Sequence, residues 1–369
     1  MNAKKLTILS LLLVGALLLV ACGSAAAEPA AEPAAEEAAP AEEAAAEEAA
    51  ALPVPAETKV IHVVNGTLGD KSFTDSAHRG LTKAAEEFGF ELVTNEAGTD
   101  PAKWEPAFQD AVQDPDSDVI LIASSDLIPV MLEAAVEYPE KTFIIFDNPI
   151  DFTAGDYKNV YAIQYKQNEG SYLAGLYAGL MSESKMVGAL GGMDIPVIND
   201  FMVGYKQGAM DAGIPEENVL VQYASGWSDP AKGKELALTM YQQGADIVFQ
   251  VAGGTGEGVF YAAQEAGKWA IGVDSDQYAI ENETNPELAK VILTSMLKNV
   301  DNSLYRAMKM YFEGTLPVGT NENLGISEGG VGLAYNDYYE AMTPQEVKDK
   351  IAEAQAKVTA GEIKINTVF

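Results

Sequence analysis

Apolar positions along the chain fall into two kinds of segment that alternate from Lys59 onward. Short, almost wholly apolar runs indicate buried β-strands, and the longer segments between them carry apolar residues at helical spacing. Strands are predicted at residues 60–64, 90–95, 118–123, 142–146, 186–190, 219–223, 246–251, 270–273, 291–296 and 330–335. Helices are predicted at residues 76–89, 103–114, 127–138, 170–181, 201–212, 230–243, 258–266 and 300–312, with a last helix that opens near residue 343.

This alternation is typical of parallel β-sheets that are covered by helices on both faces. One set of elements ends at about residue 164 and the pattern then starts again, so we predict two similar doubly wound α/β domains. The roughly 310 residues after the N-terminal spacer are too many for one ordinary core and fit two domains. Ligands of open sheets bind beyond the carboxyl ends of the strands, so the residues just after each strand are candidates for a site.

The N-terminus has the pattern of an export signal. Two lysines precede the apolar stretch 6–20, and small residues follow it up to Cys22, the only cysteine of the chain. This stretch of about 15 residues is shorter than the roughly 20 that span a bilayer. Its end, Leu-Val-Ala-Cys, resembles a bacterial lipobox, which implies removal of residues 1–21 and lipidation of Cys22; the alternative is an ordinary secretory signal with an incidental cysteine. We therefore expect an extracytoplasmic protein that is lipid-anchored to the bacterial cell membrane.

Residues 22–57 are expected to form a tether. After the cysteine this segment is almost entirely Ala, Glu and Pro, so it cannot bury enough apolar surface to offset the entropy of ordering. The whole chain has 55 acidic and 23 basic residues and a formal net charge of -32. Such an excess of negative charge repels nucleic acid, offers no basic patch to lipid headgroups, and favours neutral or cationic ligands over anionic ones.

Side chains that suit a small polar ligand follow several of the predicted strands. They comprise three aspartates, two phenylalanines, a glycine and a lysine: Asp70, Phe73, Asp147, Phe201, Gly253, Asp274 and Lys298. Because the carboxyl ends of parallel strands meet at one edge of a sheet, we expect these residues to converge on one cleft. Taken singly, each also has a structural interpretation as a core ring, a helix cap or a solvated charge. Trp227 could line the cleft as well, whereas Trp104 is expected to pack on a helix face.

A glycine loop after the strand at 246–251 raises the alternative of a dinucleotide-binding dehydrogenase. Gly254 and Gly256 begin a G-x-G-x-x-G pattern, and Asp274 lies about 20 residues further on, where such enzymes bind a ribose hydroxyl. Val259, however, takes the place of the third glycine and would crowd the helix against the strand. An exported protein also has no supply of nicotinamide. With two histidines and no nucleophile elbow or zinc motif, the sequence favours a binding protein without cofactor, metal or catalytic residue.

Six segments at these strand ends resemble, in this order, the basic membrane protein family of lipoprotein substrate-binding components of ABC importers, typified by purine nucleoside receptors. The segments are residues 70–73, 191–196 with Phe201, 228–232, 251–256, 272–276 and 294–298. The resemblance extends from about Lys59 to Tyr335. It implies a type I periplasmic-binding-protein fold, in which two doubly wound parallel-sheet lobes are joined by three crossover strands. The lobes would comprise residues 58–165 with about 292–315, and residues 166–291 with about 316–369.

The resemblance implies which residues would bind the purine base. Phe73 and Phe201, one from each lobe, would sandwich the purine, and aromatic stacking on a base contributes about 1–3 kcal/mol and tolerates different bases. Asp147, together with Asp70, would hydrogen-bond the edge of the base. The family commonly has Asn where this chain has Thr74, a difference that would alter base preference.

The same resemblance assigns the sugar to residues of the later strands. Asp274 and Lys298 would hydrogen-bond the ribose hydroxyls, and charge-assisted hydrogen bonds of this kind favour a ligand with vicinal hydroxyls. Gly253 would let the backbone approach the sugar. The first strand of family members often leads into an Asp, where this chain has Asn65, and this departure too would alter base preference.

We therefore predict a monomeric receptor that captures a purine nucleoside by hinge closure and delivers it to the permease subunits of an ABC importer. Two alternatives keep the same fold. One is a binding protein for a sugar or another small polar metabolite, and the other is a sensory binding module that docks on a receptor instead of a permease. The fold does not decide among them, because one fold hosts many ligands.

Overall fold

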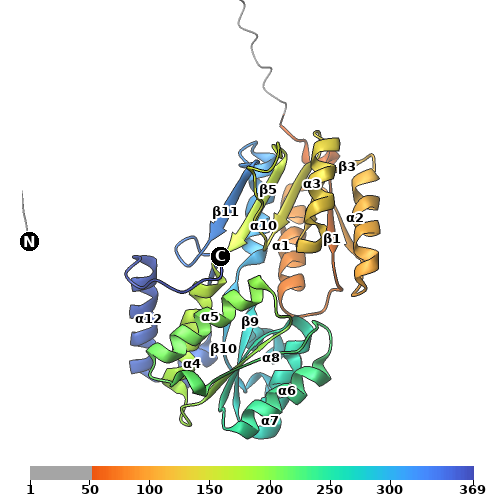
Figure 1. The fold of residues 1–369 in the computed structure, drawn as a ribbon. Coiled ribbons are helices and arrows are strands. Elements are labelled where there is room, and N and C mark those ends of the chain that lie inside the picture. Colours follow the sequence, from red (N-terminus) through yellow and green to blue (C-terminus); the bar gives the residue numbers. More distant parts are fainter. Residues whose placement is uncertain (1–51) are drawn as a thin grey trace, which may run out of the picture. The chain divides into compact units, whose positions relative to one another are not determined.

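The computed structural model describes residues 52–369, which form two lobes, each built on a six-stranded β-sheet (Figure 1). The predicted signal peptide at residues 1–21, Cys22 and most of the predicted tether lie outside the described residues. The described end of the tether carries a short 3-10 turn at Pro55–Glu57. Within residues 52–369 no helix combines the length and the apolar character that crossing a membrane requires.

The first lobe contains an all-parallel sheet with the strand order β11-β5-β4-β3-β1-β2. Its strands are β1 (Lys59–Val64), β2 (Glu91–Glu96), β3 (Ser117–Ile122), β4 (Thr142–Phe146), β5 (Val160–Tyr165) and β11 (Thr320–Leu324). The covering helices are α1 (Phe73–Phe88) and α10 (Val300–Phe312) on one face, and α2 (Trp104–Gln113) and α3 (Ile128–Glu137) on the other. Successive residues of β1 face opposite sides of the sheet: Val60 packs in the core under α1 and Ile61 in the core under α2.

The second lobe has the strand order β12-β10-β9-β8-β6-β7. Its parallel strands are β6 (Val187–Gly191), β7 (Val219–Tyr223), β8 (Ile247–Val251), β9 (Trp269–Asp274) and β10 (Ile292–Lys298), and the edge strand β12 (Val331–Leu333) is antiparallel to β10. The covering helices are α4 (Gln167–Met181) and α5 (Pro196–Asp211) on one face, and α6 (Pro230–Gln243) and α7 (Glu257–Ala266) on the other. The remaining helices are α8 (Gln277–Thr284), α9 (Pro286–Ala289), α11 (Asp337–Met342) and α12 (Gln345–Thr359). Further 3-10 turns occupy Pro101–Lys103, Ser125–Leu127, Glu216–Asn218 and Gly253–Gly256.

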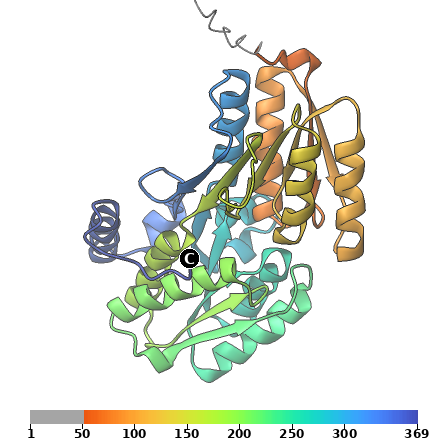
Figure 2. The ribbon, with the colours of Figure 1, turned by 45° about the horizontal axis from the view of Figure 1, so that its top comes forward.

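Three chain crossings join the lobes, and Figure 2 shows them between the two sheets. The chain passes from the first sheet to the second after β5, returns after β10, and passes over again between β11 and β12. The predicted class of two doubly wound, mainly parallel sheets is confirmed.

Two strands belong to the lobe opposite to the one predicted. Residues 292–298 form β10, which pairs with β9 of the second sheet, although the prediction placed about 292–315 in the first lobe. Residues 320–324 form β11, which pairs with β5 of the first sheet, although about 316–369 was assigned to the second lobe. An apolar run indicates that a strand is buried but not which sheet it joins. Strand β11 was missed because it is a largely exposed polar edge strand.

Candidate functional site

Residues from both sheets contact one another where the two lobes meet. Asp147, directly after β4 of the first sheet, forms an ion pair with Lys298 at the end of β10. Ser72, just before α1, donates its hydroxyl to Asp274 at the end of β9. The junction between the lobes is thus formed by strand ends, the place where open α/β sheets bind ligands.

Lys298 lies at the centre of this junction. Its side chain is only 1% exposed. Its ammonium nitrogen lies 5.3 Å from the ring centroid of Phe73 and 5.1 Å from that of Phe201. Phe73 is the first residue of α1, whereas Phe201 lies in the second turn of α5, because that helix begins at Pro196 and not at Phe201 as predicted. Rings from two lobes therefore share one cation, a favourable arrangement in a site with little water.

The two rings differ in how the protein supports them. Phe201 is 2% exposed and belongs to the core of the second lobe beneath α5. Phe73 is half-buried and stacks on Phe146 at the end of β4, with ring centroids 5.5 Å apart and planes inclined by 28°. A ring that is backed by another ring of its own lobe is a rigid platform for a flat ligand.

Asp147 and Asp274 share an uncommon backbone conformation at the ends of β4 and β9. Asp147 has a φ of 69° and Asp274 a φ of 63°, in the left-handed region that residues other than glycine seldom adopt. Conformations of this kind cost free energy and cluster at functional sites. Both carboxyl groups are bound by side chains of the opposite lobe, Asp147 by Lys298 and Asp274 by Ser72.

The two aspartates compete for one cation. Burial raises the pKa of Asp274 to about 7, and the Lys298 ammonium and the Ser72 hydroxyl offset this only in part. Burial also raises the pKa of Asp147, against the attraction of Lys298. Near neutral pH the Asp274 carboxyl can therefore either donate or accept a hydrogen bond, which suits a ligand that carries hydroxyl groups.

The other two predicted contacts, Asp70 and Gly253, have defined places in local structure. The Asp70 carboxylate accepts hydrogen bonds of 3.0, 2.9 and 3.1 Å from three backbone N–H groups that follow it, so it caps the start of α1. Gly253 opens a 3-10 turn with a φ of 53°, a conformation that favours glycine. A contact of either residue with a ligand stays a prediction.

Tyr165 is a member of the junction that sequence reasoning missed. It ends β5 at the first crossing, is 2% exposed, and its ring centroid lies 5.1 Å from the Lys298 ammonium. Its hydroxyl is hydrogen-bonded to Ser303 of α10. The sequence predicts no strand at residues 160–165, and no motif marks Tyr165. The pairing of the strands brings its ring to Lys298.

The two candidate tryptophans lie in different settings. Trp227 is 40% exposed, and its ring covers Gly192 at the end of β6, where a Cβ would come within 2.3 Å of an indole carbon. Trp104 packs with the core under α2 and α3, and its indole N–H donates to the carbonyl of Gly98 at 2.7 Å. The predicted helix-face role of Trp104 is confirmed, while a ligand contact of Trp227 stays a prediction.

A second group of charges joins the lobes nearer to solvent. The Lys71 ammonium lies 2.6 Å from a carboxylate oxygen of Glu257 on α7 and 2.8 Å from one of Glu281 on α8. The side chains of Lys71 and Glu257 are 33% and 23% exposed, whereas that of Glu281 is 3% exposed. We call these three residues the rim cluster, and we call Lys298, Asp147, Asp274 and the rings of Phe73 and Phe201 the central cluster.

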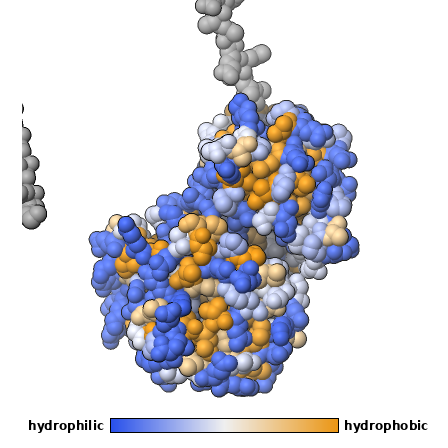
Figure 3. Space-filling model, viewed as in Figure 1, coloured by the Kyte–Doolittle hydropathy of each residue, from blue (hydrophilic) through white to orange (hydrophobic). Residues whose placement is uncertain are grey.

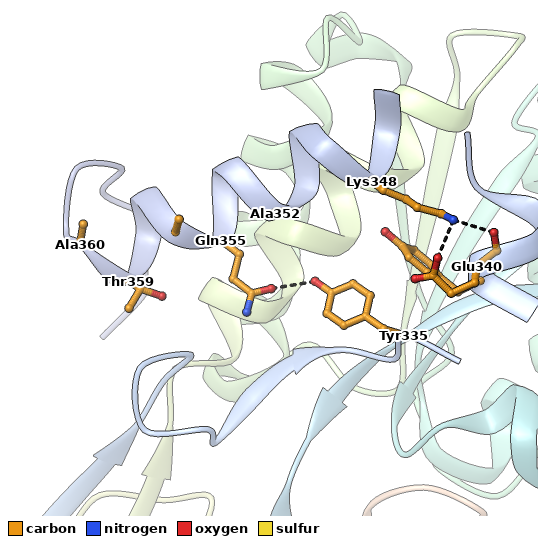
Figure 4. Close-up of a pocket in the computed structure, with 9 residues that line it drawn as sticks. Tyr335, Glu340, Lys348, Ala352, Gln355, Thr359 and Ala360 are labelled. Atoms are coloured by element: carbon orange, nitrogen blue, oxygen red, sulfur yellow. Dashed lines mark hydrogen bonds and ion pairs between the residues drawn. The ribbon is translucent and has the colours of Figure 1, made fainter. Parts of the chain in front are cut away.

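An open pocket of about 640 Å³ lies apart from both clusters, against α12. Figure 4 shows Tyr335 reaching Gln355 across it, with Lys348 paired to Glu340 farther along. No residue of the central cluster lines this pocket. Among residues 52–369 there is no group of three or more potential metal ligands. On the face shown in Figure 3, apolar patches on both lobes are interrupted by hydrophilic residues. The central cluster is therefore the candidate site.

Comparison with known proteins matches residues 57–367 to a family described as ABC transporter substrate-binding protein PnrA-like. A relative from Listeria monocytogenes named CD4+ T-cell-stimulating antigen is 33% identical, over 81% of this chain and 85% of that protein. The ABC transporter nucleoside-binding protein BmpA of Lactococcus lactis is 31% identical, over 83% and 88%. A crystal structure of an ABC transporter solute-binding protein from Aeropyrum pernix K1 is similar with a TM-score of 0.75 and 27% identity, over 84% of this chain and 93% of that one. The expected type I periplasmic-binding-protein fold is thereby confirmed.

Proposed function

Because the chain belongs to the family of PnrA-like ABC transporter substrate-binding proteins, we propose that it binds a purine nucleoside between its two lobes. Proteins of this family are non-catalytic receptors that supply a small molecule to a transporter. The observation that carries the proposal is the buried Lys298 ammonium, which lies beside phenylalanine rings from opposite lobes and forms an ion pair with Asp147. A flat base attached to a sugar with hydroxyl groups matches this combination of ring faces and charges.

The base is proposed to stack between Phe73 and Phe201. In the described structure the Lys298 ammonium lies against both rings, so a stacking base displaces it toward the sugar. Stacking on aromatic side chains contributes about 1–3 kcal/mol per base. The ammonium has three protons to donate, so it can keep its bond to Asp147 and still reach a ribose hydroxyl.

The sugar hydroxyls are proposed to bind Asp274 and Lys298. These residues carry opposite charges at the ends of adjacent strands, β9 and β10. Vicinal hydroxyls can donate to a carboxylate and accept from an ammonium at the same time, and such charge-assisted hydrogen bonds are stronger than neutral ones. The acidic surroundings of this single lysine disfavour a phosphorylated sugar.

Ligand capture is proposed to proceed by hinge closure about the three crossings. Each lobe supplies one of the two rings and at least one of the charged groups, so a ligand that touches all of them stabilises the closed arrangement. The contacts of Lys298 with Asp147 and of Ser72 with Asp274 already join the lobes, and a bound nucleoside would reinforce these links.

The proposal extends to the N-terminus. Lipidation of Cys22 would hold the receptor at the outer face of the cell membrane, where the permease subunits take over the ligand. The Ala-, Glu- and Pro-rich tether would give a reach of roughly 50 Å if helical and about 110 Å if extended.

The test uses the chain from residue 23 onward, which lacks the signal peptide and the lipid. Calorimetric titration with adenosine, guanosine, inosine, uridine and ribose should show binding of at least one purine nucleoside and weaker or no binding of ribose. No heat with any nucleoside would overturn the proposal. Binding of a sugar alone would favour the sugar-receptor alternative, and mass spectrometry of a ligand that co-purifies would identify it directly.

A further inference from the structure

Residues 364–368, which we call the strap, run back from α12 to lie beside α5 (Figures 1 and 2). The Gln207 side-chain amide donates to the carbonyl of Lys364 at 3.0 Å and accepts from the backbone N–H of Asn366 at 2.7 Å. The strap thus follows α5 from its second half toward its first turns.

At those first turns the strap binds a buried carboxylate, Asp200, which is 1% exposed. One of its oxygens accepts hydrogen bonds from the Thr367 hydroxyl at 2.6 Å and from the backbone N–H of Val368 at 3.0 Å. The other oxygen accepts from the side-chain amide of Gln167 at 2.9 Å. Within residues 52–369 all three donors are neutral, and a buried carboxylate without a cation is tolerated only when hydrogen bonds satisfy it.

Asp200 connects three segments at the point where the second ring enters the site. It immediately precedes Phe201 on α5, and Gln167 opens α4 two residues after Tyr165 at the first crossing. Successive residues of an α-helix point about 100° apart, so a fixed Asp200 also fixes the direction of Phe201. The charge of Asp200 also contributes to the raised pKa of Asp147, although burial is the larger cause.

Close packing of α4 against α5 fixes the distance between the helix axes. A Cβ on Gly204 would lie 2.2 Å from the carbonyl oxygen of Asn168, so the two backbones touch. This backbone contact lies one turn beyond Phe201, and it does not fix the orientation of the side chains in the first turns of α5. The hydrogen bonds of Asp200 add a constraint there, beside the core packing of Ile198, Phe201 and Met202.

We propose that Asp200 and the strap are a positioning device that holds Phe201 in the orientation needed to stack on the ligand. This inference rests on the proposed function, in which Phe201 is one of the two platforms. It assigns residues 367 and 368, which are remote in sequence from every predicted contact, to the support of the binding site.

The test compares variants of the chain from residue 23 onward, with nucleoside affinity measured by calorimetry. Asp200→Ala leaves Gln167 and Thr367 without their acceptor, and we expect about tenfold weaker binding, a part of the full stacking contribution. Thr367→Val removes a single donor and should weaken binding about threefold. Tyr172→Phe is the matched control, because it removes a 2.9 Å hydrogen bond from α4 to Asp211 at the other end of α5; its affinity should stay that of the parent chain.

Asp200→Asn is expected to rescue binding to within about threefold of the parent. The Oε1 atom of Gln167 is buried and has no hydrogen-bond partner among residues 52–369. Rotation of the Gln167 amide would let this atom accept from the NH₂ group that the substitution introduces, while the carbonyl oxygen of the same new side chain still accepts from the strap.

A double-mutant cycle separates positioning from general destabilisation. In a Phe201→Ala background the affinity loss caused by Asp200→Ala should vanish, since the ring it positions is absent. An equal loss in both backgrounds, or an equal loss for Tyr172→Phe, would overturn the inference. Hydrogen exchange of residues 197–203 without ligand should be faster in Asp200→Ala than in Tyr172→Phe, and unchanged exchange would also overturn it. If the parent chain binds no nucleoside, the proposed function fails. The hydrogen-exchange measurement still tests whether Asp200 and the strap order residues 197–203.

Discussion

The central cluster and the rim cluster both join the two lobes through a lysine, but they differ in exposure and in neighbours. Lys298 is 1% exposed and lies beside aromatic rings, whereas Lys71 is 33% exposed and touches only carboxylates. Removing a charge from water is costly, and a buried pair recovers that cost only with well-placed partners. A ligand that enters between the lobes can replace the ring contacts of the buried Lys298. The more exposed Lys71 can only strengthen or weaken the closure of the two lobes.

Removal of the buried cation should have the largest effect. Lys298→Met leaves the Asp147 carboxylate, which is only 14% exposed, without its counter-charge. Breaking a buried ion pair costs about 3–5 kcal/mol of folding free energy. Nucleoside affinity should fall by at least about a hundredfold, since the same ammonium is proposed to bind the sugar. Urea unfolding and calorimetry measure the two effects.

The double variant Lys298→Met, Asp147→Asn distinguishes stability from binding. It removes both charges, and Asn tolerates the left-handed backbone at position 147. Most of the lost stability should return, because no unpaired charge is left, but affinity should not. A double variant that binds like the parent would show that the central charges do not touch the ligand.

The aromatic part of the central cluster should give the next largest effect. Phe201→Leu keeps a buried apolar side chain but removes the flat ring, so nucleoside binding should weaken by about 1–3 kcal/mol. Phe260→Leu, a fully buried ring of the second lobe on α7, is the matched control and should lower stability without lowering affinity. Equal affinity of Phe201→Leu and the parent would reassign Phe201 to the core.

The protonation of Asp274 should make stability depend on pH. Its pKa of about 7 in the folded state exceeds the usual value of 3.8, so the folded chain holds an extra proton between about pH 4 and pH 7. The contribution of Asp274 to the free energy of unfolding is thus full below pH 4 and is lost as pH rises to 7, with a slope of up to about 1.4 kcal/mol per pH unit.

Urea unfolding of Asp274→Asn at pH 5 and pH 8 measures this contribution. Asn tolerates the positive φ at position 274. Relative to the parent, the variant should gain stability as pH rises. Asp126→Asn, at an exposed position of the first lobe, controls for the loss of a charge and should show no such trend. A parallel response of both variants would contradict the buried, raised-pKa carboxyl.

The rim cluster should give the smallest effect. Glu257→Gln weakens only the pair between Glu257 and Lys71, whose side chains are 23% and 33% exposed, and partly exposed ion pairs contribute about 1 kcal/mol or less. Lys71 keeps its pair with the buried Glu281. Affinity should fall about two- to fivefold through a smaller population of the closed form, and the difference should shrink in 0.5 M salt, whereas that of Lys298→Met should persist. Lys234→Met, which breaks the exposed pair with Glu265 within the second lobe, should not change affinity.

The sequence by itself determined the local structure and most of the candidate site. Periodicity located most of the longer helices and buried strands, because an element with one buried face repeats its apolar residues with the period of that element, but it missed the buried strand β5. The rule that ligands bind at strand ends selected Phe73, Asp147, Phe201 and Lys298, which the structure brings together. Motif resemblance identified the family that comparison confirms.

Only the tertiary structure decided which strand joins which sheet and what surrounds the lysine. Strand β10 pairs in the second lobe and β11 in the first, choices that depend on hydrogen bonds between residues far apart in the chain. The same long-range pairing places Tyr165 next to Lys298 and the strap next to Asp200. The periodicity of apolar residues predicts that a side chain is buried, but it is the same whichever distant segment packs against that side chain. Local patterns therefore do not predict such contacts.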